Sequence, residues 1–293
     1  MRAIVRKGFG GLEQLVIQER PDPEPQPGQV IIEVKAFGIN HAEMHMRKGE
    51  WAEAAEISGI ECVGIVKSCP DGQFPIGSKV AALMGGMGRS INGSYAEYTR
   101  VPATNVIKIE SELSWADLAV IPESYATAWT CLHRNLELAE GQTLVIRGAT
   151  SALGQAALNI AANAGAYVIA TTRNRERFQK LEALGAQRVE IESPDLSAHI
   201  PDRKRIDAVL NLVGNRTLLD SLSIVRRGGR VCQAGFLGGL APRSLLPANM
   251  VMKLSKSLSS GLYFTVFVTT QVPYSASEQL LNFVVMREEQ ATC

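Results

Sequence analysis

The 293-residue chain lacks a large net charge of either sign and any long apolar run. Lys and Arg number 30 against 29 for Asp and Glu, so the formal net charge is only +1. This balance gives no basic surface for nucleic acid, and the apolar content of 46% argues against a disordered chain. No window spans a bilayer, and the start M-R-A-I-V-R-K-G has no apolar signal core. We therefore expect a cytoplasmic protein without membrane or nucleic-acid partners.

Cysteine is also scarce, and the cysteines present are scattered, odd in number and without a C-x-x-C pair. Such a set predicts reduced thiols that pack as small hydrophobic groups, and it argues against a disulfide framework. The chain is long enough for two domains, each with its own core. The cysteines are Cys62, Cys69, Cys131, Cys232 and Cys293.

The first part of the chain, to about residue 110, consists of short β-rich runs that Gly and Pro interrupt. The run Gln29–Ala36 mixes apolar and polar side chains, which is typical of an antiparallel strand. The preceding segment 21–28 carries four prolines, so it cannot pair inside a sheet and is expected on the surface. This part of the sequence predicts a small β-barrel.

From about residue 120 the pattern changes to alternating strands and helices. This alternation predicts an α/β fold with parallel strands in a doubly wound sheet. Glycines at 165 and 185 follow two of the helices, as C-terminal stops do. The expected strands are Thr143–Arg147, Tyr167–Thr172, Arg188–Ile191, 208–213 and 230–233, and the expected helices are 153–163, 175–184 and 217–225.

A tight turn of small residues joins the strand Thr143–Arg147 to the following helix. It keeps only the third glycine of a G-x-G-x-x-G motif, although two further positions, Ala149 and Ser151, are small. A strand that feeds a helix through such a turn aims backbone N–H groups and the positive helix end at one spot, which suits a pyrophosphate. We interpret it as a dinucleotide-binding turn rather than an ordinary strand-to-helix turn. Its residues are Ala149, Thr150, Ser151, Ala152, Leu153 and Gly154.

The end of the second strand bears on the choice of coenzyme. Proteins that select NAD usually carry Asp or Glu there, about twenty residues after the turn, for the ribose hydroxyls. This chain has Thr171, Thr172 and Arg173 instead. A guanidinium can pair with a 2′-phosphate that a carboxylate would repel, so Arg173 predicts NADPH, with Arg177 as a weaker second ligand. The alternative is that these arginines belong to a solvated helix start.

Five separate blocks of sequence together resemble the medium-chain dehydrogenase/reductase superfamily, and within it the zinc-free quinone oxidoreductase branch. The resemblance covers most of the chain, and five blocks in the family's order are more specific than any one of them. The blocks are G-I-N-H-A-E-M-H-M-R-K-G at 38–49, N-G-S-Y-A-E-Y at 92–98, P-E-S-Y-A-T-A-W-T-C-L at 122–132, G-A-T-S-A-L-G at 148–154 and G-G-R-V-C-Q-A-G at 228–235.

The resemblance implies a GroES-like β-barrel substrate domain over residues 1–120 and a Rossmann NADPH-binding domain over 121–260. It also implies NADPH-dependent reduction of a quinone, enone or alkenal in the cleft between them. Residues 261–293 form a C-terminal segment, with an edge strand and a helix at 276–286, that looks shortened relative to the family. In members of the family, the strand equivalent to the edge run 262–268 pairs with the same strand of a second subunit. The resemblance therefore implies a homodimer.

The same resemblance implies roles for individual residues. Asn40 stands where zinc-dependent relatives carry a cysteine, and its amide can donate to a substrate oxygen or instead stabilise a turn. His45 stands where quinone reductases often carry Tyr; it is expected to bind the nicotinamide ribose or relay a proton, unless it is an exposed loop histidine. Thr127 resembles the family's Thr beside the nicotinamide. Further coenzyme contacts are implied at Gly214, Asn215, Gly235, Phe236 and Leu237.

The chain lacks the ligands of the family's zinc sites. Zinc-dependent relatives carry Gly-His-Glu where this chain has Gly59, Ile60 and Glu61, and neither Asn40 nor Ile60 can bind zinc as thiolate or imidazole do. His41, Glu43 and His45 could form a rival metal site, with the two histidines on one helix face. No further strong ligand that would complete such a site is evident nearby in the sequence. We therefore predict no metal. A substrate reduced without a Lewis acid must already be activated, as quinones and conjugated enones are.

Two alternatives remain open. The chain could bind NADPH with little turnover in a sensing or structural role, which the shortened C-terminal segment would favour. It could instead reduce another activated double bond as an enoyl reductase.

Overall fold

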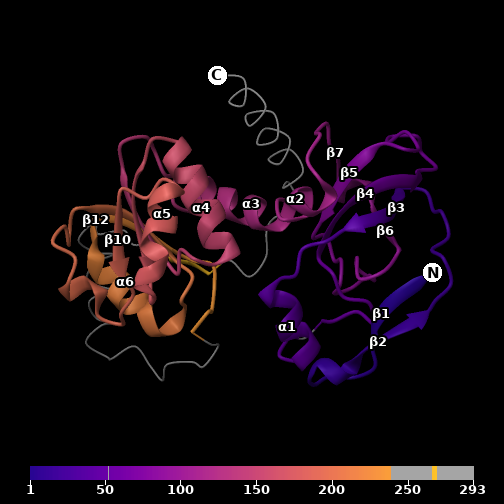
Figure 1. Cartoon of the computed structure of the whole chain (residues 1–293), viewed down its shortest axis with the longest axis horizontal. Helices are drawn as coiled ribbons and strands as arrows, with labels where there is room; N and C mark the ends of the chain where they lie inside the picture. Colours follow the sequence, from indigo (N-terminus) through magenta and orange to yellow (C-terminus); the bar gives the residue numbers. More distant parts are fainter. Residues whose placement is uncertain (52, 239–265, 269–293) are drawn as a thin grey trace. The chain divides into compact units, whose positions relative to one another are not determined.

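The computed structural model describes residues 1–51, 53–238 and 266–268, and these fall into two compact units. Unit 1 runs to Ala126, and unit 2 begins at Thr127 (Figure 1). In this part of the chain, no helix has both the length and the apolar character needed to cross a membrane.

Unit 1 contains a two-stranded and a five-stranded antiparallel sheet. The small sheet pairs β1 (Arg2–Arg6) with β2 (Leu15–Glu19). The larger sheet has the order β6-β3-β4-β5-β7 (Figure 1). Its strands are β3 (Gln29–Ala36), β4 (Glu61–Ser68), β5 (Lys79–Leu83), β6 (Tyr98–Pro102) and β7 (Val106–Lys108).

The five-stranded sheet is bent around an apolar core. Register shifts between β3 and β4 interrupt regular pairing and increase the local twist. At Gly64 a Cβ atom would lie 2.2 Å from the carbonyl oxygen of Glu33, so the two strands approach each other only because this position is glycine. The buried core includes Val30, Ile32, Cys62, Val66 and Val80.

Unit 1 also contains short helices, and α3 (Pro122–Trp129) begins in it and continues into unit 2. Helix α1 (His41–Lys48) starts after Asn40 and stops at Gly49, which adopts a left-handed φ of 76°. Helix α3 begins with proline, whose fixed φ suits the first helical position, and continues into a π-helical turn over Thr130–Asn135. The remaining helical elements of unit 1 are α2 (Trp115–Ala119) and the 3₁₀ turns Leu12–Gln14 and Ala103–Asn105.

Unit 2 is built on a six-stranded parallel sheet with the order β10-β9-β8-β11-β12-β13. This order reverses between β8 and β11, so right-handed crossovers place helices on both faces, as a doubly wound sheet requires. The strands are β8 (Thr143–Arg147), β9 (Tyr167–Thr172), β10 (Arg188–Ile191), β11 (Ile206–Asn211), β12 (Val225–Gln233) and β13 (Val266–Val268). The predicted α/β class and parallel sheet are confirmed.

Several boundaries differ from the predicted ones. Strand β11 ends at Asn211 and not at 213, because the Asn211 side chain accepts the N–H groups of Val213 and Gly214, both at 3.1 Å, and turns the chain. The predicted helices 153–163, 175–184 and 217–225 become α4 (Ala152–Asn163), a 3₁₀ turn Arg175–Arg177 with α5 (Phe178–Ala183), and a 3₁₀ turn Asn215–Thr217 with α6 (Leu218–Ile224).

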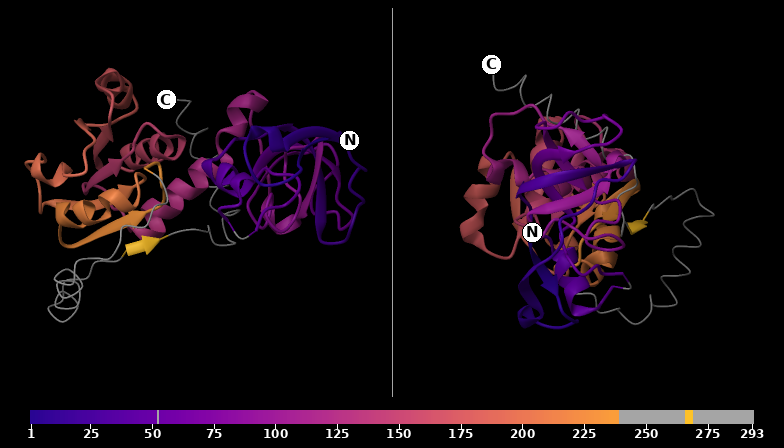
Figure 2. Two further views of the ribbon diagram at one scale, coloured as in Figure 1. Left: turned by 90° about the horizontal axis from the view of Figure 1, so that it is seen from below. Right: turned by 90° about the vertical axis from the view of Figure 1, so that its right-hand side faces the viewer.

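The last strand of the sheet, β13, comprises three residues of the predicted edge run 262–268. Strand β13 pairs with β12 in parallel and is the last strand of the sheet in the part of the chain that the structure describes; it is the yellow arrow in Figure 2. The rest of the run 262–268 and the predicted helix 276–286 lie outside the described residues.

Candidate active site

The small-residue turn after β8 has the geometry of a helix N-terminus prepared for an anion. The Ser151 hydroxyl accepts the N–H of Gly154 at 3.0 Å and donates to the carbonyl oxygen of Gly148 at 2.9 Å. Its proton is therefore used to shape the turn. The N–H groups of Ala152 and Leu153 lie in the first turn of α4, where an intrahelical acceptor is lacking, so they are the donors available to a pyrophosphate.

The single glycine kept from the motif, Gly154, has a steric reason to be glycine. A Cβ atom there would lie 2.6 Å from the carbonyl oxygen of Gly148 and 2.7 Å from the Cα of Ala149. Only glycine therefore lets α4 start this close to β8, while Ala149 is fully buried beneath the turn.

The loops that follow β8, β11 and β12 converge at the same edge of the sheet. The Leu237 N–H donates to the carbonyl oxygen of Leu212 at 3.0 Å. Gly214, with φ 107°, approaches the Cα of Phe236, and Asn215 accepts a 3.0 Å hydrogen bond from Gln233. The predicted coenzyme residues Gly214, Asn215, Gly235, Phe236 and Leu237 thus lie together. All belong to the carboxyl edge of a parallel sheet, where coenzymes bind.

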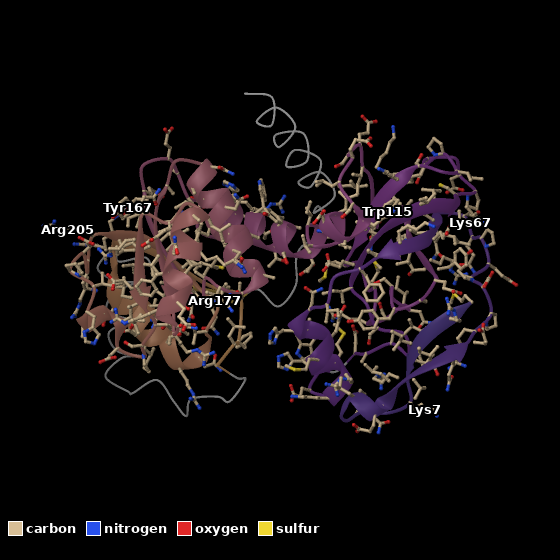
Figure 3. The ribbon with its side chains drawn as sticks, viewed as in Figure 1. Lys7, Lys67, Trp115, Tyr167, Arg177 and Arg205 are labelled. Atoms are coloured by element: carbon tan, nitrogen blue, oxygen red, sulfur yellow. The ribbon has the colours of Figure 1, made fainter. Side chains whose placement is uncertain are left out.

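The end of β9 presents basic side chains. Thr172 is buried and accepts the N–H of Asn174 through its hydroxyl at 3.2 Å. Arg173 follows it and is exposed, and no ion pair of its guanidinium occurs among residues 1–51, 53–238 and 266–268. Arg177, labelled in Figure 3, is also exposed. No carboxylate stands at the strand end in the place that NAD-selective proteins use.

In unit 1, Asn40 is held by two acids. Its backbone N–H donates to the carboxylate of Glu43 at 2.8 Å, which fixes the start of α1. Its side-chain Nδ2 donates to Oε1 of Glu61, also at 2.8 Å. The second oxygen of Glu61, Oε2, accepts the backbone N–H of Glu123 at 2.8 Å. Asn40 is half-buried, whereas Glu61 is only 2% exposed.

Both acids are unusual because they are buried. Burial raises the pKa of Glu61 to about 8, and the charges of Glu123 and Glu43 add to the effect. Burial also raises the pKa of Glu43, although that carboxylate accepts the Tyr95 hydroxyl at 2.7 Å and the Ile60 N–H at 3.0 Å. Neither acid was expected from the sequence to take part in the reaction. An acid inside the apolar run I-E-C-V-G-I-V was the signal that could have revealed Glu61.

Comparison with known proteins decides the family. Residues 26–111 match the alcohol dehydrogenase GroES-like domain, and residues 152–282 match the zinc-binding dehydrogenase domain. Human quinone oxidoreductase is 29% identical over 275 residues, which cover 90% of this chain and 80% of that protein. The chain belongs to the medium-chain dehydrogenase/reductase superfamily, in its quinone oxidoreductase branch.

The chain is also similar to proteins with other names. A synaptic vesicle membrane protein VAT-1 homolog-like protein from Mus musculus is 29% identical over 214 residues, or 65% of this chain, and the chain spans about half the length of that relative. The crystal structure of an NAD-dependent alcohol dehydrogenase superposes with a TM-score of 0.85 at 26% identity, covering 99% of this chain and 90% of that one. Members of this superfamily use a nicotinamide coenzyme, NAD or NADP.

The sequence resemblance sets Asn40 and Ile60 against the positions where zinc-dependent relatives carry a cysteine and a histidine. Neither residue supplies a thiolate or imidazole for a zinc ion. Throughout the part of the chain that the structure describes, no three His, Cys, Asp or Glu side chains are placed to hold a metal ion. That the protein works without zinc stays a prediction.

The two other predicted catalytic residues lie on helices. His45, on α1, contacts the Glu50 carboxylate through Nδ1 and lies parallel to the Trp51 ring at 6.2 Å between centroids. It is thus anchored in a helix, with 14% of its side chain exposed, and does not hang from a loop. Thr127 is half-buried in α3 and is the first residue of unit 2.

Proposed function

We propose that this protein is a cytoplasmic, NADPH-dependent and zinc-independent reductase that transfers hydride to a quinone, enone or alkenal. The observation that carries this proposal is the end of β9, where the exposed Arg173 takes the place of an acid. The quinone oxidoreductase relatives support the reaction class, and the absence of zinc ligands at Asn40 and Ile60 favours substrates that are already activated.

In this proposal, residues 121–260 form the coenzyme domain. The N–H groups of Ala152 and Leu153 bind the pyrophosphate, and Arg173 and Arg177 bind the 2′-phosphate. The backbone of the loop 235–237 holds the remainder of the coenzyme, with Thr172, Gly214 and Asn215 beside it. When bound, the reduced nicotinamide supplies the hydride, and the protein orients it.

Residues 1–120 form the substrate domain of the same proposal. Asn40 donates an N–H of its side-chain amide to the substrate oxygen on which negative charge develops. His45 binds the nicotinamide ribose or delivers a proton, and its contact with Glu50 fixes the orientation of the ring. Thr127 is placed beside the nicotinamide.

The activity is tested by NADPH consumption with a panel of ortho- and para-quinones, enones and alkenals, with NADH in parallel. We expect turnover with at least one of these classes and at least about tenfold preference for NADPH, which corresponds to about 1.4 kcal/mol. NADPH binding without oxidation by any of them would point to a sensing or structural role. A requirement for a carrier-bound enoyl substrate would point to an enoyl reductase.

The last strand of the sheet leads to a second prediction, that the protein is a homodimer through the run 262–268. Among the described residues, strand β13 (Val266–Val268) is the last strand of the six-stranded sheet, and an edge strand without a partner readily pairs with another chain. Light scattering at micromolar concentration is expected to give twice the mass of 31.7 kDa. A monomeric mass, or a dimer that survives Phe267→Pro unchanged, would count against pairing through this strand.

A further inference from the structure

We propose that Glu61 is a positioning residue for Asn40, and that a proton on Glu61 reverses the orientation of the Asn40 side-chain amide. The ionised carboxyl turns the amide nitrogen toward itself, and the neutral carboxyl turns the amide oxygen toward itself. The inference rests on the proposed function, because Asn40 is the substrate donor in that proposal.

The carboxyl group of Glu61 has two defined partners and little room. Oε1 accepts Nδ2 of Asn40 and Oε2 accepts the backbone N–H of Glu123, both at 2.8 Å. A Cβ atom at Gly38 would lie 2.1 Å from Oε1, so the carboxyl packs directly against the chain at this glycine. Glu61 therefore cannot withdraw from Asn40 without losing both hydrogen bonds and its packing.

The backbone N–H of Glu123 determines which oxygen takes the proton. A backbone N–H can only donate, so Oε2 remains an acceptor in both states of Glu61. A proton on the carboxyl must then sit on Oε1, which faces Asn40. An O–H and an N–H cannot both point at each other, so the Asn40 amide has to present its oxygen. Rotation about the terminal torsion of Asn40 exchanges two groups of nearly equal shape and needs no backbone movement, although it turns the amide oxygen away from the backbone N–H of Glu43, its partner in the capping box at the start of α1.

The surroundings of Glu61 allow both the neutral and the ionised carboxyl to form near neutral pH. The ionisable groups that face it are Glu43 on α1, Tyr95 ahead of β6, Glu123 at the start of α3 and the neighbouring Cys62, and none of them is a cation. Burial and the charges of Glu123 and Glu43 disfavour the carboxylate and raise the Glu61 pKa to about 8. The neutral acid therefore predominates at pH 7, and the carboxylate above pH 8.

The two orientations differ in what they offer a substrate. With neutral Glu61, both amide hydrogens of Asn40 point away from the carboxyl, and Glu61 itself carries no charge. With ionised Glu61, one hydrogen is used by Oε1, and a buried negative charge stands next to the oxygen that becomes negative. We therefore expect kcat/KM to fall as pH rises through the Glu61 pKa, approaching about tenfold per pH unit.

Glu61→Gln tests this coupling. In that variant the Gln oxygen must accept the Glu123 N–H, so its NH₂ group faces Asn40 and fixes the amide as the neutral acid does. We expect E61Q to keep kcat/KM within about threefold of wild type at low pH and to lose the alkaline fall. Tyr95→Phe is the matched control. The Tyr95 hydroxyl lies near the Glu61 carboxyl but donates its hydrogen bond to Glu43, so Y95F should keep the alkaline fall of kcat/KM. An E61Q enzyme that retains the fall overturns the proposal.

A second measurement needs neither coenzyme nor substrate. In protein labelled with ¹⁵N at asparagine, the side-chain NH₂ signals of Asn40, assigned with Asn40→Ala, should shift between about pH 6 and about pH 10 with the midpoint of the kinetic fall. They should not shift in E61Q. Signals that stay constant in wild type overturn the inference, even if E61Q fails to fold. Signals that titrate in a protein without turnover on the whole panel support the coupling and reject only the proposed reaction.

Discussion

Arg147→Met is expected to lower the free energy of unfolding by about 3–5 kcal/mol. Arg147 ends β8 and is fully buried. Its guanidinium lies 2.6 Å from the Glu192 carboxylate and 2.7 Å from that of Asp220, and it also donates to the carbonyl oxygen of Thr217 at 3.2 Å. Methionine fills similar volume but leaves two largely buried carboxylates without a counter-charge, and such charges are costly in a protein interior. Urea denaturation followed by circular dichroism measures the change.

Two further variants separate charge from packing. Arg226→Met removes a 2.6 Å ion pair with Asp207 in which the arginine side chain is 42% exposed, so its cost should stay below about 1 kcal/mol. Adding Glu192→Gln and Asp220→Asn to Arg147→Met removes the uncompensated charges and should restore more than about 1 kcal/mol. If the triple variant is as unstable as Arg147→Met alone, lost packing and not unpaired charge is responsible.

The strands of unit 2 could be predicted from the sequence because their cause is local. β8, β9 and β10 are apolar runs bounded by turn residues, and their predicted bounds agree with the structure. β11 was misplaced by two residues because the side chain of Asn211 ends the strand. The network around Arg147 was missed, since its partners Glu192 and Asp220 lie 45 and 73 residues along the chain. No local pattern brings such residues together.

In the candidate site, too, some features could be predicted from the local sequence and others depend on the fold. The turn from Ala149 to Gly154 could be found from residue sizes and spacing alone. The use of Ser151 as a helix cap could not, because a serine at that position suits a cap and a phosphate ligand equally well. Asn40 was recognised through its family position, but its dependence on Glu61 appears only when β4 is folded beside α1.

Arg173→Ala is expected to weaken NADPH binding by about 10- to 100-fold, which is the loss of one charge-assisted hydrogen bond to the 2′-phosphate, worth about 1.5–3 kcal/mol. NADH lacks this phosphate, so its dissociation constant should change little. The preference for NADPH then falls by the same factor. Fluorescence titration of both coenzymes gives the two constants directly.

Arg175→Ala is the matched control for this variant. Arg175 lies two residues further on, is also exposed, and places its guanidinium 6.0 Å from the centre of the Phe178 ring. Both variants remove one positive charge from the same loop, so any long-range attraction for the coenzyme falls equally in the two. A loss confined to Arg173→Ala therefore identifies a direct phosphate contact. Equal losses would mean that general charge attracts the coenzyme, and no loss in either would leave β9 without a role in selecting NADPH.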